Sequence, residues 1–143
     1  MKIEPMREEY REEIQGMMRV FYASPAVLTN GSEEIFRADI DACLSDEPWL
    51  EGYVFVEAGE LIGYTMLASG FSTEYGRRCI WIEDLYFKPE YRGKGYGSLA
   101  LDFIHQRYPE AILRLEVEEE NRRAIHVYRK NGFDALGYLE MKR

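Results

Sequence analysis

Three glycines at alternate positions, Gly93, Gly95 and Gly97, mark the part of this sequence with the most specific chemistry. They follow an aromatic and branched run, Ile80–Phe87, that is typical of a buried strand, and Pro89 ends that strand because it cannot donate a ladder hydrogen bond. Without a Cβ, glycines let neighbouring backbone N–H groups turn toward one point. The next residues favour a helix, whose N-terminus adds unpaired N–H groups and a positive dipole end. This stretch therefore predicts an anion site, most naturally for a phosphate group.

The spacing of these glycines separates the known kinds of phosphate-binding turn. A nucleotide P-loop ends in Gly-Lys-Ser or Gly-Lys-Thr, which is absent here, and the dinucleotide fingerprint places glycines at its first, third and sixth positions. In this chain the glycines stand at the first, third and fifth positions. The pattern that fits is Arg/Gln-x-x-Gly-x-Gly/Ala, in the run Arg92-Gly93-Lys94-Gly95-Tyr96-Gly97.

A second pattern lies downstream, Asn-x-x-Ala-x-x-x-Tyr-x-x-x-Gly-Phe, and all five fixed positions are present: Asn121, Ala124, Tyr128, Gly132 and Phe133. Through these two patterns, residues Ile80 to Phe133 resemble the GNAT superfamily of acetyl-CoA-dependent N-acetyltransferases. Within that superfamily, the run Trp81 to Tyr86 is most similar to the polyamine and small-amine acetyltransferases. The N-terminal third of the chain carries little of the resemblance.

The resemblance implies that the cofactor is acetyl-CoA and that the glycine turn holds its pyrophosphate. An open strand edge can pair with amides as another strand would, and in the resembled family the main chain of this strand pairs with the two amides of the pantetheine arm. Asn121 corresponds to a residue that bonds the pantetheine region. The cofactor-binding residues implied in this way are Leu85, Tyr86, Phe87, Arg92, Gly93, Lys94, Gly95, Tyr96, Gly97, Ser98, Asn121 and Tyr128.

Acetyl transfer from a thioester to an amine requires a base for the amine and an acid for the departing thiolate. Glu83, on the central strand, is the candidate base, and the resembled amine acetyltransferases carry a glutamate at the matching place. The alternative is that Glu83 or Asp84 only binds a cationic substrate or pairs with an arginine. Tyr128 is the candidate acid, because a phenol stays protonated at pH 7. Its alternative is a core tyrosine whose hydroxyl is bonded elsewhere.

The expected acceptor site combines Phe21, Tyr22, Glu83 and Asp84. In the resembled family the segment that follows the first helix lines this site, whereas the alternative is that the two aromatic residues simply pack the core. The formal charge of −8, from 18 Lys plus Arg against 26 Asp plus Glu, favours cationic substrates such as amines, or else serves solubility alone. The same sign argues against binding of nucleic acid.

These features predict an acetyl-CoA-dependent N-acetyltransferase that acts on a primary amine, most naturally a small cationic one, by direct attack in a ternary complex. The alternatives are acetylation of a protein N-terminus or lysine, and a coenzyme A-binding module without turnover. Cys43 and Cys79 lack metal-ligand spacing, so no metal is expected. Free thiols and the absence of a signal or a long apolar run indicate a cytoplasmic protein that does not bind membranes. The resemblance also implies a homodimer.

These residues require a scaffold, and the pattern along the chain predicts one N-acetyltransferase domain over residues 1–143. The expected order is β-αα-βββ-α-β-α-β, an α/β fold of the GNAT type with a mixed sheet and helices on both faces. The expected strands are Met1 to Pro5, Trp49 to Glu57, Leu61 to Ala68, Ile80 to Phe87, Ala111 to Glu118 and Leu136 to Met141. The expected helices are Arg7 to Phe21, a segment capped by Ser32 and ending at Leu44, Ser98 to about Tyr108, and Asn121 to about Gly132.

Overall fold

The structure is a computed structural model that describes residues 1–143, and its centre is one five-stranded sheet in the order β1-β2-β3-β4-β5. The strands are β1 (Lys2–Pro5), β2 (Leu50–Glu57), β3 (Glu60–Ser72), β4 (Arg77–Phe87) and β5 (Ile112–Leu115). The helices are α1 (Arg11–Tyr22), α2 (Glu33–Leu44), α3 (Tyr96–Arg107) and α4 (Arg122–Lys130), with short 3-10 turns η1 (Glu8–Tyr10) and η2 (Pro89–Tyr91). The first four strands pair antiparallel, and β5 pairs parallel to β4.

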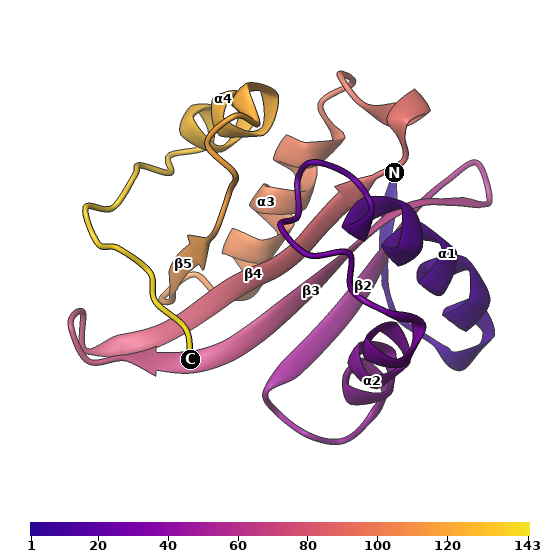
Figure 1. Cartoon of the computed structure of the whole chain (residues 1–143), viewed down its shortest axis with the longest axis horizontal. Coiled ribbons are helices and arrows are strands. Elements are labelled where there is room, and N and C mark those ends of the chain that lie inside the picture. The colour runs from indigo at the N-terminus through magenta and orange to yellow at the C-terminus, as the bar shows by residue number, and fades with distance from the viewer.

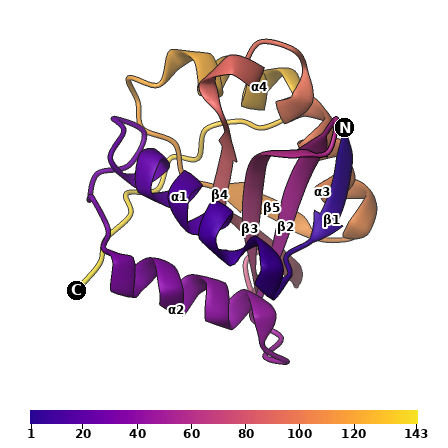
Figure 2. The same cartoon turned by 90° about the vertical axis from the view of Figure 1, so that its right-hand side faces the viewer.

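Helices α1 and α2 cover one face of the sheet and α3 covers the other, with α4 beside α3 (Figures 1 and 2). On the first face, Met18 of α1 and Ile40 of α2 are wholly buried together with Tyr64 of β3. On the second face, Ile104 of α3 packs with Ile80 of β4. Each helix therefore buries its apolar side against the sheet. The predicted mixed sheet with helices on both faces is confirmed.

Helix α2 begins where the sequence predicts, because the Ser32 hydroxyl accepts a hydrogen bond from the backbone N–H of Ile35 at 3.1 Å. A serine in this position satisfies one of the unpaired N–H groups of the first turn. Phe36 and Ile40 of this helix are buried, whereas the side chain of Ile35 is 49% exposed. The buried apolar side of α2 is therefore narrower than the spacing of its apolar residues indicates.

Strand β4 contains a bulge at Glu83, which the sequence does not reveal. Asp84 lies opposite Met66 and Ile82 lies opposite Leu67, so Glu83 has no partner in β3. The extra residue reverses the alternation of the strand. Ile82 packs in the cluster beneath α3, whereas Asp84 faces the α1 side, where it accepts a hydrogen bond from a side chain at the end of α1.

The last predicted strand, Leu136 to Met141, is wrong, because these residues pair with no strand and run as irregular chain across the front of the sheet (Figure 1). In a strand, Leu136 and Tyr138 would lie on one face, and Leu139 and Met141 on the other. Neither face would then be consistently apolar, and the register of such strands is weakly specified. Tyr138 instead donates a hydrogen bond to Glu74 in the β3–β4 turn. No helix of the chain is both long and apolar enough to span a membrane.

Candidate active site

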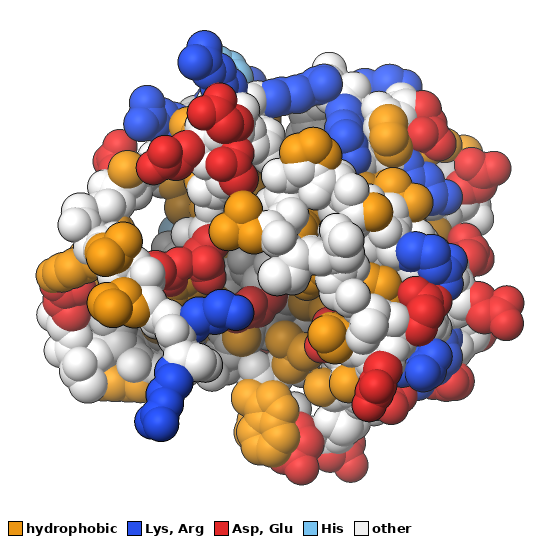
Figure 3. Space-filling model, in the orientation of Figure 1, with side chains coloured by type: hydrophobic (Ala, Val, Ile, Leu, Met, Phe, Trp, Pro, Cys, Tyr) orange, Lys and Arg blue, Asp and Glu red, His pale blue; other side chains and the backbone are white.

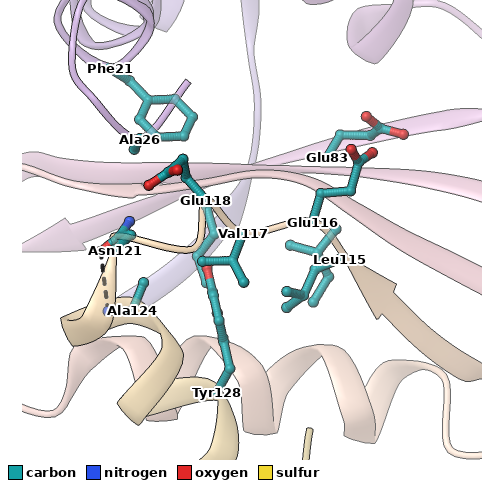
Figure 4. A pocket seen from close by; sticks show the side chains of 12 residues that line it. Phe21, Ala26, Glu83, Leu115, Glu116, Val117, Glu118, Asn121, Ala124 and Tyr128 are labelled. Carbon is teal, nitrogen blue, oxygen red and sulfur yellow. Dashed lines mark hydrogen bonds between the residues drawn. The ribbon is translucent and has the colours of Figure 1, made fainter. Parts of the chain in front are cut away.

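One pocket lies where β4 and β5 separate, between α4 on one side and the end of α1 on the other (Figure 4). Its lining combines apolar side chains with three carboxylates and no lysine or arginine: Phe21, Ala26, Ile82, Glu83, Leu85, Leu115, Glu116, Val117, Glu118, Asn121, Ala124 and Tyr128. Figure 3 shows a hollow in this face of the molecule with acidic side chains at its border. The pocket therefore has a negative lining on an apolar floor.

The pocket exists because the pairing of β4 with β5 is short. The parallel register runs from Cys79 opposite Ile112 to Ile82 opposite Leu115, and it ends there. Beyond Ile82, β4 continues to Phe87 while the chain after Leu115 turns away from the sheet. The main chain of residues 83–87 therefore has no strand on that side, which leaves an edge that an extended ligand with amides can pair with.

The glycine turn lies between β4 and α3 and presents a row of free donors. Gly93 and Gly95 have φ of 76° and 85°, a conformation that side chains with a Cβ rarely adopt. The backbone N–H groups of residues 93–98 have no acceptor within the chain, and the first intrahelical bond runs from Leu99 to the carbonyl of Gly95. Six adjacent unpaired N–H groups at a helix N-terminus fit a diphosphate. Helix α3 begins at Tyr96, earlier than the predicted Ser98.

Two of the basic residues near this turn, Arg92 and Lys94, contact groups of the protein itself, and a third reaches the turn from α4. Arg92 donates from Nε to the carbonyl oxygen of Phe87 at 2.8 Å and stacks over the ring of Tyr86, so it fixes the end of β4. The ammonium of Lys94 lies 5.5 Å from the ring centroid of Tyr91. Arg123, which sequence reasoning missed, brings its guanidinium from α4 to Gly93, where Nη2 would lie 2.7 Å from an added Cβ.

Tyr128 and Asn121 reach the pocket from opposite ends of α4. The Tyr128 ring packs against Phe133, and no side-chain hydrogen bond acts on its hydroxyl, so the hydroxyl is free to donate to a ligand. Burial raises the pKa of Tyr128 above the usual phenol range, which keeps the proton in place at neutral pH. Asn121 caps α4 by accepting from the backbone N–H of Ala124 at 3.3 Å, which leaves its amide N–H groups for a ligand.

Glu83 lines the pocket, and its surroundings favour the protonated form. Burial is the main cause that raises the pKa of Glu83, and the negative charges of Asp84 and Glu140 add to it. A carboxylate with a raised pKa is a stronger base once it is ionised. Phe21 lines the same pocket from the end of α1.

Asp84 and Tyr22 lie behind the pocket rather than in its lining. The Asp84 side chain is 4% exposed, and its two oxygens accept hydrogen bonds from Tyr22 at 2.8 Å and Tyr64 at 2.7 Å. Of the four residues expected at the acceptor site, Phe21 and Glu83 reach the cavity, whereas Tyr22 and Asp84 bond to each other behind it.

Sequence reasoning missed the carboxylates that other segments add to this region. Glu116 and Glu118 follow β5, and Glu140 comes from the C-terminal segment. Glu140, as a hydrogen-bonding neighbour, and burial raise the pKa of Glu116 to about 7. For Glu116 and Glu118 the one available signal was their position after β5, which is parallel to β4, because carboxyl ends of adjacent parallel strands meet at one edge of a sheet.

Comparison with known proteins identifies the family. The sequence model of the acetyltransferase (GNAT) family matches residues 7–133. Thialysine N-epsilon-acetyltransferase of Bos taurus is 37% identical over 83 residues, which cover 56% of this chain and 48% of the bovine protein. The uncharacterized N-acetyltransferase YhfO of Bacillus subtilis is 30% identical over 138 residues, 92% of this chain and 81% of that one. The chain therefore belongs to the GNAT acetyltransferase family.

A solved structure shows the same fold. The aminoglycoside N-acetyltransferase AAC(6′)-Iy in complex with CoA matches with a TM-score of 0.81 at 15% identity, over 99% of this chain and 93% of that one. The alignment with the bovine relative, by contrast, spans only about half of that protein's length.

Members of the GNAT family are N-acetyltransferases that use acetyl-CoA, and the unpaired N–H groups of the glycine turn fit that cofactor.

Proposed function

We propose that this chain transfers the acetyl group of acetyl-CoA to the primary amino group of a small cationic amine, which attacks directly within a ternary complex. The observation that carries the proposal is the pocket lining, which holds Glu83, Glu116 and Glu118 and no basic side chain. Such a lining attracts a cation and repels an anion. The bovine relative is named a thialysine N-epsilon-acetyltransferase, which supports a small acceptor with an amino group.

In this proposal Glu83 takes the proton from the incoming ammonium group, directly or through one water. An alkylamine has a pKa near 10.4, so only about one molecule in a thousand is neutral and nucleophilic at pH 7. The raised pKa of Glu83 narrows the gap between base and amine. Phe21 and Leu85 provide apolar walls that keep bulk water from the proton transfer.

Tyr128 acts at the other side of the pocket, where it donates the proton of its hydroxyl to the leaving group. No side-chain hydrogen bond engages its hydroxyl elsewhere, and its raised pKa keeps it protonated over the working pH range. When bound, acetyl-CoA supplies an activated thioester; the N–H groups of residues 93–98 and Arg123 would hold its phosphates, and the β4 edge would hold its pantetheine amides.

The experiment that tests the proposal is a thiol-release assay with purified protein, acetyl-CoA and a panel of acceptors. The panel contains diamines and polyamines, the lysine analogue named in the bovine relative, neutral-tailed monoamines, and peptides with a free N-terminus or an internal lysine. We expect the highest kcat/KM for small amines with a second positive charge, and a fall in kcat/KM as salt rises, because salt screens the attraction.

Two outcomes would contradict the proposal in different ways. Faster acetylation of peptides than of small amines would replace the acceptor class and leave acetyl transfer in place. Tight binding of acetyl-CoA in calorimetry with no thiol release for any acceptor would indicate a binding module without turnover. The net charge of −8 supports a small-molecule acceptor over nucleic acid, and a gel-shift assay with duplex DNA should show no binding at 0.15 M salt.

A further inference from the structure

We propose that Asp84 is a positioning residue for this reaction. It joins the β4 bulge, which carries Glu83, to the end of α1, which forms the acceptor side of the pocket. The inference rests on the proposed function, because it assigns a role within the same site. Asp84 itself does not line the cavity, so it acts through Tyr22 and through the backbone of the bulge.

The contacts of Asp84 fix it on three sides. Its Oδ1 accepts from the Tyr22 hydroxyl at 2.8 Å and its Oδ2 accepts from the Tyr64 hydroxyl at 2.7 Å. Its main-chain carbonyl accepts from the Thr65 hydroxyl at 2.7 Å. Tyr64 and Thr65 are wholly buried on β3, so the bulge cannot move without breaking buried hydrogen bonds. The position of Glu83, the preceding residue in the chain, is thereby fixed.

The contact with Tyr22 links this fixed point to the acceptor side of the pocket. Tyr22 is the last residue of α1, and its ring packs at 5.4 Å against Phe21, which lines the pocket. Ala26, four residues further on, lines the pocket as well. The segment after Ala26 returns to Tyr22, since a Cβ added at Gly31 would lie 3.3 Å from its ring. One hydrogen bond to Asp84 therefore orients the chain that forms this wall.

A contribution to stability alone does not account for a carboxylate at this place. A buried carboxylate costs desolvation free energy, and apolar residues of similar size at such positions are often as stable or more stable. The flanking cluster is apolar and aromatic, with Phe36 and Tyr86 in direct reach of Tyr22 and Phe21. A carboxylate instead fixes the orientation of the two tyrosine side chains, because it accepts a charge-assisted hydrogen bond from each phenol.

The same carboxylate lies next to Glu83 and acts on its charge. The groups that face Glu83 are Asp84 on β4, Asp39 on α2, Tyr22 on α1, Glu116 after β5, and Glu140 in the C-terminal segment. None of them is basic. Removing the negative charge of Asp84 should therefore let Glu83 ionise at lower pH, while the other acidic groups stay in place.

A matched pair of substitutions separates positioning from stability. Tyr22→Phe and Tyr64→Phe each remove one hydroxyl donor to Asp84. Tyr22 belongs to the end of α1 that forms the pocket wall, with its ring 5.4 Å from Phe21, whereas Tyr64 lies on β3 with its ring 6.5 Å from Phe21. We expect Tyr22→Phe to raise KM for the amine roughly tenfold, and Tyr64→Phe to lower the Tm and to raise KM less than Tyr22→Phe does. Equal kinetic parameters in the two folded variants would overturn the positioning role.

A second measurement does not depend on turnover, so it also works if the proposed acceptor class fails. In the NMR spectrum of the acetyl-CoA-free protein, the Glu83 side-chain carboxyl carbon is titrated in wild type and in Asp84→Asn. We expect the variant to titrate at lower pH, and Tyr22→Phe to shift the Ala26 methyl signal more than Tyr64→Phe does. An unchanged Glu83 titration with equal Ala26 shifts would refute the proposal. If Asp84→Asn does not fold, the two tyrosine variants carry the test through the Ala26 signal.

Discussion

Glu83 and Tyr128 line one pocket from opposite sides, Glu83 from the bulge in β4 and Tyr128 from α4 (Figure 4). The gap between them is the place where β4 and β5 cease to pair. A base and an acid on opposite walls of one cavity can act on two ends of the same reacting group, which is the arrangement that amine acetylation requires.

The first prediction concerns the glycine turn. Gly95→Glu should raise the dissociation constant for acetyl-CoA by at least about tenfold, or 1.4 kcal/mol, because it puts a negative charge and a strained backbone beside the free N–H groups. Titration calorimetry measures the effect. Gly76→Glu is the control, since Gly76 also has positive φ and open space around it but lies in the β3–β4 turn. Unchanged affinity in folded Gly95→Glu would remove the turn from the cofactor site.

The second prediction concerns Tyr128. Tyr128→Phe should keep acetyl-CoA affinity but lower kcat roughly 10²-fold, as loss of general-acid catalysis usually does. In wild type the basic limb of the pH–kcat profile should lie above the ordinary phenol range, because burial raises the pKa of Tyr128. Tyr91→Phe is the control, as its exposed hydroxyl bonds Glu60 outside the pocket. Near-normal turnover in Tyr128→Phe would show that the leaving group departs without this phenol.

The third prediction separates two roles for Glu83. If Glu83 is the base, Glu83→Gln should lower kcat/KM most near neutral pH and recover in part as pH rises, because solution then supplies neutral amine. If it only binds the cation, KM should rise while kcat stays close to wild type. The pH–rate profile decides, with Glu119→Gln as a control outside the pocket lining. A variant equal to wild type in both parameters from about pH 6 to 10 would exclude both roles.

The fourth prediction concerns stability and Glu116. Its pKa in the folded protein is raised from 4.5 to about 7, so the folded state holds this proton more tightly than the unfolded state. Its contribution to the free energy of unfolding is therefore full below pH 4.5 and is lost as pH rises through about 7. Calorimetry should show that the Tm falls less between pH 4.5 and about 7 in Glu116→Gln than in wild type. An identical fall would mean that Glu116 and Glu140 do not interact in solution.

Much of the fold was predictable from the sequence because the deciding signals are local. The Ser32 cap, the glycine turn and the apolar pattern of α1 and α2 each act within a few residues. The final strand was mispredicted at Leu136 to Met141 because β-propensity says nothing of whether a partner strand is present. Here the segment crosses the sheet and makes side-chain contacts instead.

The features of the site fall into the same two groups, those that local sequence predicts and those that depend on long-range packing. Residue type and spacing are enough to predict the glycine turn and the excess of negative charge, and the resemblance to the family adds the candidate pair Glu83 and Tyr128. The bulge that puts Asp84 in the core, where Tyr22 and Tyr64 hold it, is visible only in the folded chain. Folding also brings Glu116 and Glu140 together. Long-range packing and strand register set these distances, and no local pattern encodes them.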